Sequence, residues 1–183
     1  MTKKNILLYA LALIVCFLLG LALALGLRTL DQRRIEPIQG GQQLDYADFG
    51  FTMRVPEDAI VRDHTVESYE NEPGTLYAGS FTTQEDGVLY LFCYENTERD
   101  NLKDHREQDV VTHYMSAGAT QVRMRDFGGR RFICYRAAVL GPDGEESWDS
   151  YETWNEHVQI TFETRMPPAK VLPILATIEF SEN

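Results

Sequence analysis

The chain has 183 residues, with 28 Asp and Glu against 17 Lys and Arg, so its formal net charge is −11. This length suits one ordinary domain with an appendage. The acidity argues against a nucleic-acid-binding protein, which normally needs a basic surface. Hydrophobic residues make up 44% of the chain, too many for a disordered protein, and three cysteines are too few for a disulfide scaffold.

Residues 6–27 form an uncharged segment rich in Leu and Ala. As a helix, this segment would reach ~33 Å and could cross a hydrocarbon core of ~30 Å. The sequence therefore predicts a single transmembrane helix over 6–27, after a short tail of residues 1–5 and before a polar juxtamembrane linker over 28–44. A cleaved signal peptide is the alternative, because Ala22-Leu23-Ala24 offers a small-x-small cleavage pattern.

The charges that flank this segment indicate its orientation. Lys3, Lys4 and the α-amine precede it, and all the acidic residues follow it. Because Lys and Arg are retained on the cytoplasmic side of a membrane, this arrangement favours a cytoplasmic N-terminus. We therefore expect residues 45–183 to form an extracytoplasmic domain of a single-pass membrane protein of bacterial type.

The sequence of residues 45–183 predicts several strands. Phe49–Val55 alternates apolar and polar residues and ends at Pro56, and hairpin turns are expected at 84–87, where Asp86-Gly87 is a turn signal, and at 141–144. Further strands are predicted over 76–83, 88–95, 120–127, 130–140, 146–154 and 157–165.

Two helices complete the expected elements. Residues 97–118 carry an apolar stripe that ends at Gly118, and residues 169–178 follow Pro167-Pro168. The order of strands, helix, strand meander and helix predicts an α+β fold, with a twisted, mostly antiparallel sheet flanked by helices.

Three stretches resemble the PsbP-like superfamily of α/β/α sandwich domains, over residues 49–180. They are DFGFTMRVPEDA, GGRRFICYRAAVLGPDGEESWDSYETWNEHVQITFE and PPAKVLPILATIEF. One departure is that Glu57-Asp58-Ala59-Ile60 follows Pro56, where members often carry a Trp. The resemblance implies a largely non-enzymatic protein, either secreted or anchored, with no shared catalytic residues to carry over.

Few residues suggest chemistry. His105, Asp109 and His113 fall at i, i+4 and i+8 of the predicted helix, a spacing that could place two His and one carboxylate around a metal ion. A solvated helix face explains the same pattern, and we prefer that interpretation. No catalytic residue, cofactor or metal ligand is assigned.

Cys93 and Cys134 lie inside apolar strands. In an oxidising compartment they could form a disulfide if their Cα atoms came within ~7 Å, and otherwise they would remain buried thiols. The sequence leaves both outcomes open.

Three aromatic residues on one strand form the candidate contact surface: Trp148, Tyr151 and Trp154. Strand alternation places Trp148 and Trp154 on one face, with Ser150 and Glu152 between them, and Tyr151 on the other. The two Trp belong either to the core or to an exposed surface of the kind that is enriched at interfaces.

These patterns predict a membrane-anchored, extracytoplasmic binding or assembly module without catalytic activity. It would sit in the membrane through residues 6–27 and contact an unidentified protein partner through its sheet. One alternative is an anchored hydrolase whose site brings His105 or His113 to carboxylates in a cleft. Another is a small-ligand or lipid-binding domain with an apolar pocket between sheet and helix.

Overall fold

The computed structural model describes residues 16, 35–66, 74–83, 87–141 and 144–181. Apart from Cys16, the predicted transmembrane segment and its tail lie outside these residues. Among the residues that are described, no helix is both long and apolar enough to cross a bilayer. The folded unit spans Ile35–Asn183 and is described here by itself.

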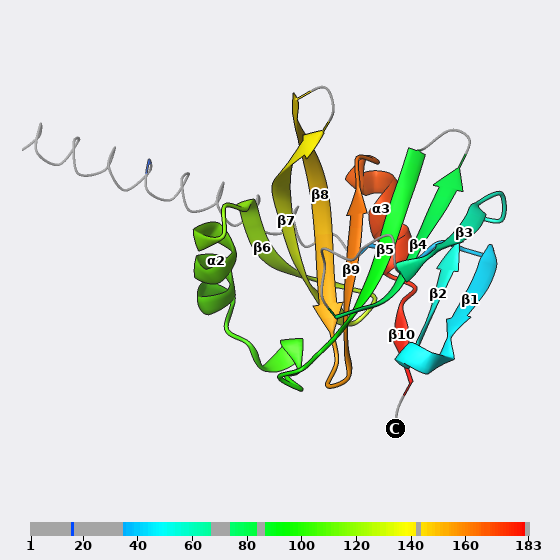
Figure 1. Ribbon diagram of the computed structural model, residues 1–183, viewed down its shortest axis with the longest axis horizontal. Coiled ribbons are helices and arrows are strands. Elements are labelled where there is room, and N and C mark those ends of the chain that lie inside the picture. The colour runs from blue at the N-terminus through cyan, green and yellow to red at the C-terminus, as the bar shows by residue number, and fades with distance from the viewer. Residues whose placement is uncertain (1–15, 17–34, 67–73, 84–86, 142–143, 182–183) are drawn as a thin grey trace, which may run out of the picture. The chain divides into compact units, whose positions relative to one another are not determined.

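A seven-stranded antiparallel sheet dominates the folded unit (Figure 1). Its strand order is β3-β4-β5-β9-β8-β7-β6. This arrangement confirms the expected mostly antiparallel sheet with its two hairpins and meander. The strands are β3 (Ile60–His64), β4 (Thr75–Thr83), β5 (Gly87–Glu95), β6 (Thr120–Phe127), β7 (Arg130–Gly141), β8 (Gly144–Trp154) and β9 (Val158–Thr164).

A second, three-stranded sheet contains strands at both ends of the folded unit. Its order is β1-β2-β10, from β1 (Gln42–Tyr46), β2 (Phe51–Val55) and β10 (Glu179–Phe180). A single 3-10 turn, η1 (Ala47–Phe49), joins β1 to β2. The sequence pattern predicted only β2 among these three strands.

The predicted linker over 28–44 needs a correction at its C-terminal end. Leu44 lies within β1, opposite Met53 of β2. The Ile38 amide donates a hydrogen bond to the Pro173 carbonyl at 3.1 Å, and the side chains of Ile35 and Ile38 pack against the core. Residues 35–44 therefore belong to the folded unit, because their few apolar side chains pack against its core.

The main helix is shorter than the sequence predicts. Helix α2 covers Glu107–Ser116, and a separate turn, η3, covers Leu102–Asp104. Arg106 between them is extended, with φ −83° and ψ 133°, and the Asn101 side chain accepts a hydrogen bond from the Lys103 amide. Asparagine side chains that bond to the nearby backbone compete with helix formation, so 97–106 folds as turns instead.

The second helix, α3, covers Pro168–Leu175 and packs on one face of the large sheet. Its buried residues, Val171, Ile174 and Leu175, join Phe51 of β2 and Phe162 of β9 in the main core. On the opposite face, α2 and η3 cover a smaller cluster around Leu102, Val110 and Ile133. The fold therefore has three layers, with the seven-stranded sheet in the middle.

Candidate functional site

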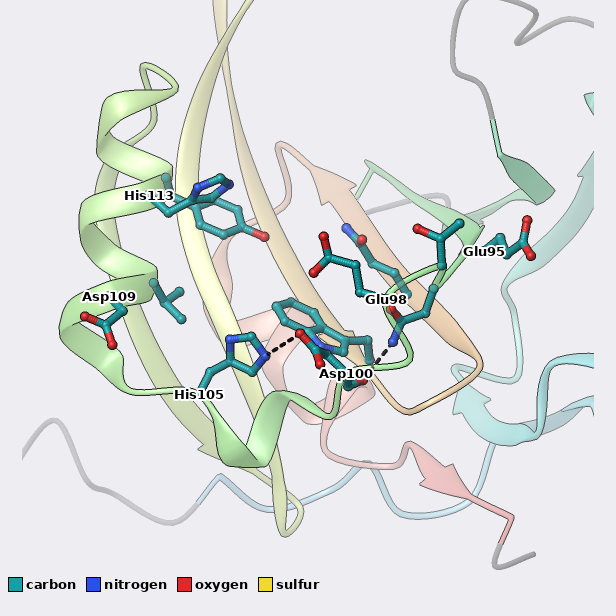
Figure 2. Close-up of a pocket in the computed structure, with 12 residues that line it drawn as sticks. Glu95, Glu98, Asp100, His105, Asp109 and His113 are labelled. Carbon is teal, nitrogen blue, oxygen red and sulfur yellow. Dashed lines mark hydrogen bonds and ion pairs between the residues drawn. The ribbon is translucent and has the colours of Figure 1, made fainter.

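A cavity of about 490 Å³ opens between α2, the segment that follows β5, and the sheet (Figure 2). We call it the α2 cleft. Its volume lies within the range of ~300–1,000 Å³ that is typical of ligand pockets. The cleft is lined by Glu95, Asn96, Thr97, Glu98, Asp100, His105, Asp109, Val110, His113, Tyr114, Trp154 and Gln159.

Trp154, at the end of β8, contributes an aromatic surface to the cleft. One side of its ring packs on the small cluster of Leu102, Val110 and Ile133, which leaves Trp154 half-buried. The ring also meets the His105 imidazole edge to face, with centroids 5.5 Å apart. Trp154 is thus fixed by apolar contacts while part of its surface stays open to the cleft.

The segment over residues 95–101 forms one wall of the cleft, and hydrogen bonds hold it in place. The Asn96 side-chain amide donates to the Asp100 carbonyl at 2.7 Å and to the Asn155 carbonyl at 2.5 Å. The Asn155 side chain in turn accepts from the Val158 amide at 2.9 Å. This network ties the backbone of the segment that carries Glu98 and Asp100 to the β8–β9 turn.

The three residues considered as a metal triad all line the cleft. His105 precedes α2 rather than lying on it, and its Nε2 is 3.5 Å from Asp100 Oδ2, whereas Asp109 and His113 lie on α2 itself (Figure 2). Within the described part of the chain, no three His, Cys, Asp or Glu side chains gather closely enough to hold a metal ion.

A buried carboxyl group, Glu152, lies next to the cleft on β8. Only 5% of Glu152 is exposed. It accepts hydrogen bonds from the hydroxyl of Tyr114 on α2, from that of Tyr135 on β7 at 2.5 Å, and from the side-chain amide of Gln159 at 3.2 Å. Burial raises the pKa of Glu152 above its ordinary value, although the two tyrosine hydrogen bonds act in the opposite direction.

The two tyrosines at Glu152 are held in their protonated form. Burial, with the nearby Glu152 carboxyl as a further cause, raises the pKa of both Tyr114 and Tyr135 well above the usual value. Their hydroxyls therefore remain donors at any physiological pH. Because Tyr114 and Gln159 both line the cleft and both bond to Glu152, they connect the cavity to this buried group.

Sequence reasoning did not identify Glu152 as a functional candidate. One signal was available in the sequence: strand alternation places Glu152 between Trp148 and Trp154 on one face. Aromatic rings cover such a face, so a carboxylate there is expected to be shielded from water. A charged residue there needs partners from other elements. Those partners come from α2, β7 and β9, and no linear spacing reveals them.

The candidate contact surface is divided by the structure. Trp154 lines the cleft, and Trp148 is half-buried further along the same face of β8. Tyr151 points to the other face, where it is only 5% exposed and belongs to the main core. Tyr151 is therefore removed from the contact surface, as the alternation along the strand requires.

Cys93 and Cys134 are both buried, and both are thiols rather than disulfide-bonded. Cys93 is on β5 and Cys134 on β7, and strands β9 and β8 lie between them. The disulfide that the sequence left open is not formed. Burial raises the pKa of Cys93 to about 12, so this thiol is protonated and unreactive.

Known proteins support the fold. No family model and no curated protein sequence matches this chain. Its structure is similar to the solution structure of a cyanobacterial PsbP (CyanoP) from Synechocystis sp., with a TM-score of 0.52 and 18% identity over 76% of this chain and 91% of that one. The expected PsbP-like fold is therefore confirmed, as a likeness of fold alone.

A second similar structure is a crystal structure from Bacteroides thetaiotaomicron. The TM-score is 0.51 and the identity is 10%, over 79% of this chain. The present chain spans only 50% of that protein. This likeness also concerns the fold and carries no residue-level function, because one fold hosts many functions.

Proposed function

We propose that this protein is a membrane-anchored binding module without catalytic activity, which contacts a protein partner outside the cytoplasm at the α2 cleft. The apolar segment 6–27 supports the anchor, and Lys3 and Lys4 support the orientation. The PsbP-like fold is consistent with a binding or assembly role rather than with catalysis.

The observation that carries this proposal is the half-exposed ring of Trp154 inside a cavity. Tryptophan is enriched among the residues that contribute most to protein–protein binding energy, especially where its ring fills or forms a pocket. The bonds of Tyr114 to Glu152 and of Asn96 to Asn155 fix two walls of the cleft. A cavity that is already formed binds with a smaller loss of conformational entropy.

A second candidate function is acid–base catalysis in the same cleft. The observation in its favour is His105, which opens on the cleft and faces the Asp100 carboxylate at 3.5 Å. A carboxylate partner orients an imidazole as a general base. Turnover of an ester, phosphoester or glycoside by the wild type, abolished in His105→Gln, would establish this function in place of the first.

The location is tested by adding protease to intact cells or, where an outer membrane surrounds them, to spheroplasts. The proposal predicts that the folded unit is digested while cytoplasmic proteins survive. Protection of the 45–183 fragment until the cells are lysed would place the domain inside and overturn the localisation.

The binding site is tested by affinity capture from native membranes. We compare the wild type with a Trp154→Phe/Glu98→Gln variant, and we use Trp148→Phe as the matched control on the same strand. Recovery of the specific partner should fall about tenfold in the double variant and stay unchanged in the control, because hot-spot residues dominate affinity. An equal melting temperature of the variants excludes unfolding, and equal recovery by both would contradict the proposed site.

A further inference from the structure

The α2 cleft is lined by four acidic residues, and Arg99 and Arg106 line an adjoining hollow together with Asp100 and Asp109. Glu95, Glu98 and Asp109 line the cleft, and none of the three forms an ion pair with another described residue. The fourth acid, Asp100, forms an ion pair with His105. Among the described residues that line the cleft there is no Lys or Arg.

On the same face of β8, another Trp ring and a carboxylate together already bind a cationic side chain of this protein. At Trp148, the guanidinium carbon of Arg165 lies 4.5 Å from the ring centroid, and Arg165 also forms an ion pair with Glu146. A cation over an aromatic ring is attracted by the negative face of the ring, and a nearby carboxylate adds to this attraction. The chain thus fills this site with its own arginine.

Trp154 lies six positions further along β8 on the same face, also beside carboxylates, but with a cavity in front of it instead of an arginine. We propose that the α2 cleft binds a lysine or arginine side chain of the protein partner, with its cationic group against Trp154 and among Glu98, Asp100 and Asp109. This inference rests on the proposed function and names the chemistry that the partner presents.

The shape and charge of the cleft fit this occupant better than other ligands. A guanidinium or ammonium group on its flexible stem fits easily into a cavity of about 490 Å³. An anion would meet the carboxylates of Glu95, Glu98, Asp100 and Asp109. The net charge of −11 attracts a basic segment from a distance as well, which speeds association at low ionic strength.

The test measures binding of a short peptide to the full chain in detergent micelles by ¹⁵N NMR. The two indole N–H signals of Trp148 and Trp154 are assigned with Trp148→Phe. The probe is Ac-Gly-Arg-Gly-NH₂, and the neutral control is the same peptide with citrulline, which keeps the shape of arginine without its charge. We expect the Trp154 signal to shift with a Kd of about 1 mM for the arginine peptide and at least about tenfold weaker binding of the citrulline peptide.

Matched variants locate the site. Glu98→Gln/Asp109→Asn changes two exposed side chains without altering the packing, and it should weaken binding of the arginine peptide about tenfold. Glu57→Gln/Asp58→Asn, at exposed positions outside the lining of the cleft, removes the same two charges from the chain and should leave the Kd unchanged. An equal loss in both variants would show attraction by the net charge alone and would overturn the proposal.

Two further outcomes are decisive. If agmatine or spermidine binds more than about tenfold tighter than the arginine peptide, the cleft takes a free amine and the partner side chain is the wrong occupant. If the arginine and citrulline peptides bind equally, the cationic occupant is wrong. Partner capture that still depends on Trp154 would then leave the proposed function standing, so the two failures are distinguishable.

Discussion

The hydroxyl of Tyr114 on α2 donates a hydrogen bond to the buried carboxyl of Glu152 on β8. This bond joins the helix that forms one wall of the cleft to the strand that carries Trp154. A carboxyl group at this depth is costly unless donors surround it, and here the donors come from three different elements. The polar cluster therefore fixes the position of α2 over the sheet.

Replacing Tyr114 by Phe tests this role. The change removes one donor from a buried acceptor, so we expect the free energy of unfolding to fall by about 1–3 kcal/mol. Tyr90→Phe is the matched control, because no hydrogen bond joins its hydroxyl to another described residue, and it should change stability by less than about 0.5 kcal/mol. Urea unfolding measures both variants, and equal losses would contradict the role of Tyr114.

The raised pKa of Glu152 predicts a pH-dependent difference between the wild type and Glu152→Gln. The unfolded chain releases the Glu152 proton near the ordinary value of 4.5, whereas the folded chain retains it to higher pH. The wild type should therefore lose stability relative to the Gln variant as the pH rises above 4.5, by up to about 1.4 kcal/mol per pH unit, until the folded pKa is passed. Unfolding curves from pH 4 to pH 8 measure this slope, and a difference that grows in favour of the wild type would show a lowered pKa instead.

The turn between β6 and β7 offers a test of the packing. Gly128 has a φ of +53°, and a Cβ there would lie 2.1 Å from the Ala176 carbonyl oxygen, just beyond α3. Gly128→Ala should therefore cost at least about 3 kcal/mol, from backbone strain and the collision together. Gly129 also has a positive φ, +80°, but open space around it, so Gly129→Ala should cost only about 1 kcal/mol. Thermal unfolding of both variants measures the loss of stability. A larger loss in Gly129→Ala than in Gly128→Ala would contradict the described turn.

Cysteine chemistry provides a further check. Because burial raises the pKa of Cys93 to about 12, native protein should be alkylated at Cys93 at least about 100-fold more slowly than unfolded protein. Peptide mapping after iodoacetamide treatment measures the rate. A Cys93–Cys134 disulfide in the oxidised protein would be incompatible with the strand order, and rapid alkylation of Cys93 would contradict the burial of its thiol.

The sequence predicted the strands best where alternation was strong. Strands β8 and β9 alternate clearly and pair with each other, and β4 and β5 are joined at an Asp-Gly turn signal. Strand β1 begins with Gln42-Gln43, and edge strand β3 is mostly polar, so neither showed an apolar pattern. These strands form because a neighbouring strand supplies their hydrogen-bond partners, which a local pattern does not reveal.

The cleft was only partly predictable. The sequence identified Trp154 and the His105–Asp109–His113 spacing, but it placed all three spaced residues on one long helix. The turn at 101–106 instead brings His105 to Asp100 and to the Trp154 ring. Glu152 gains its role only through contacts with α2, β7 and β9. Such a site arises from tertiary packing and has no linear signature.

The most direct test of the cleft as the binding site is site-specific photo-crosslinking in intact cells. A photoreactive residue replaces Thr97 at the cleft wall, and the control position is Gln108, which is exposed on α2 but does not line the cleft. We expect one partner adduct at position 97, its loss when Trp154→Phe is added, and no such adduct at position 108. Adducts at position 108 but not at 97, or an adduct at 97 that is indifferent to Trp154, would rule out the cleft as the binding site.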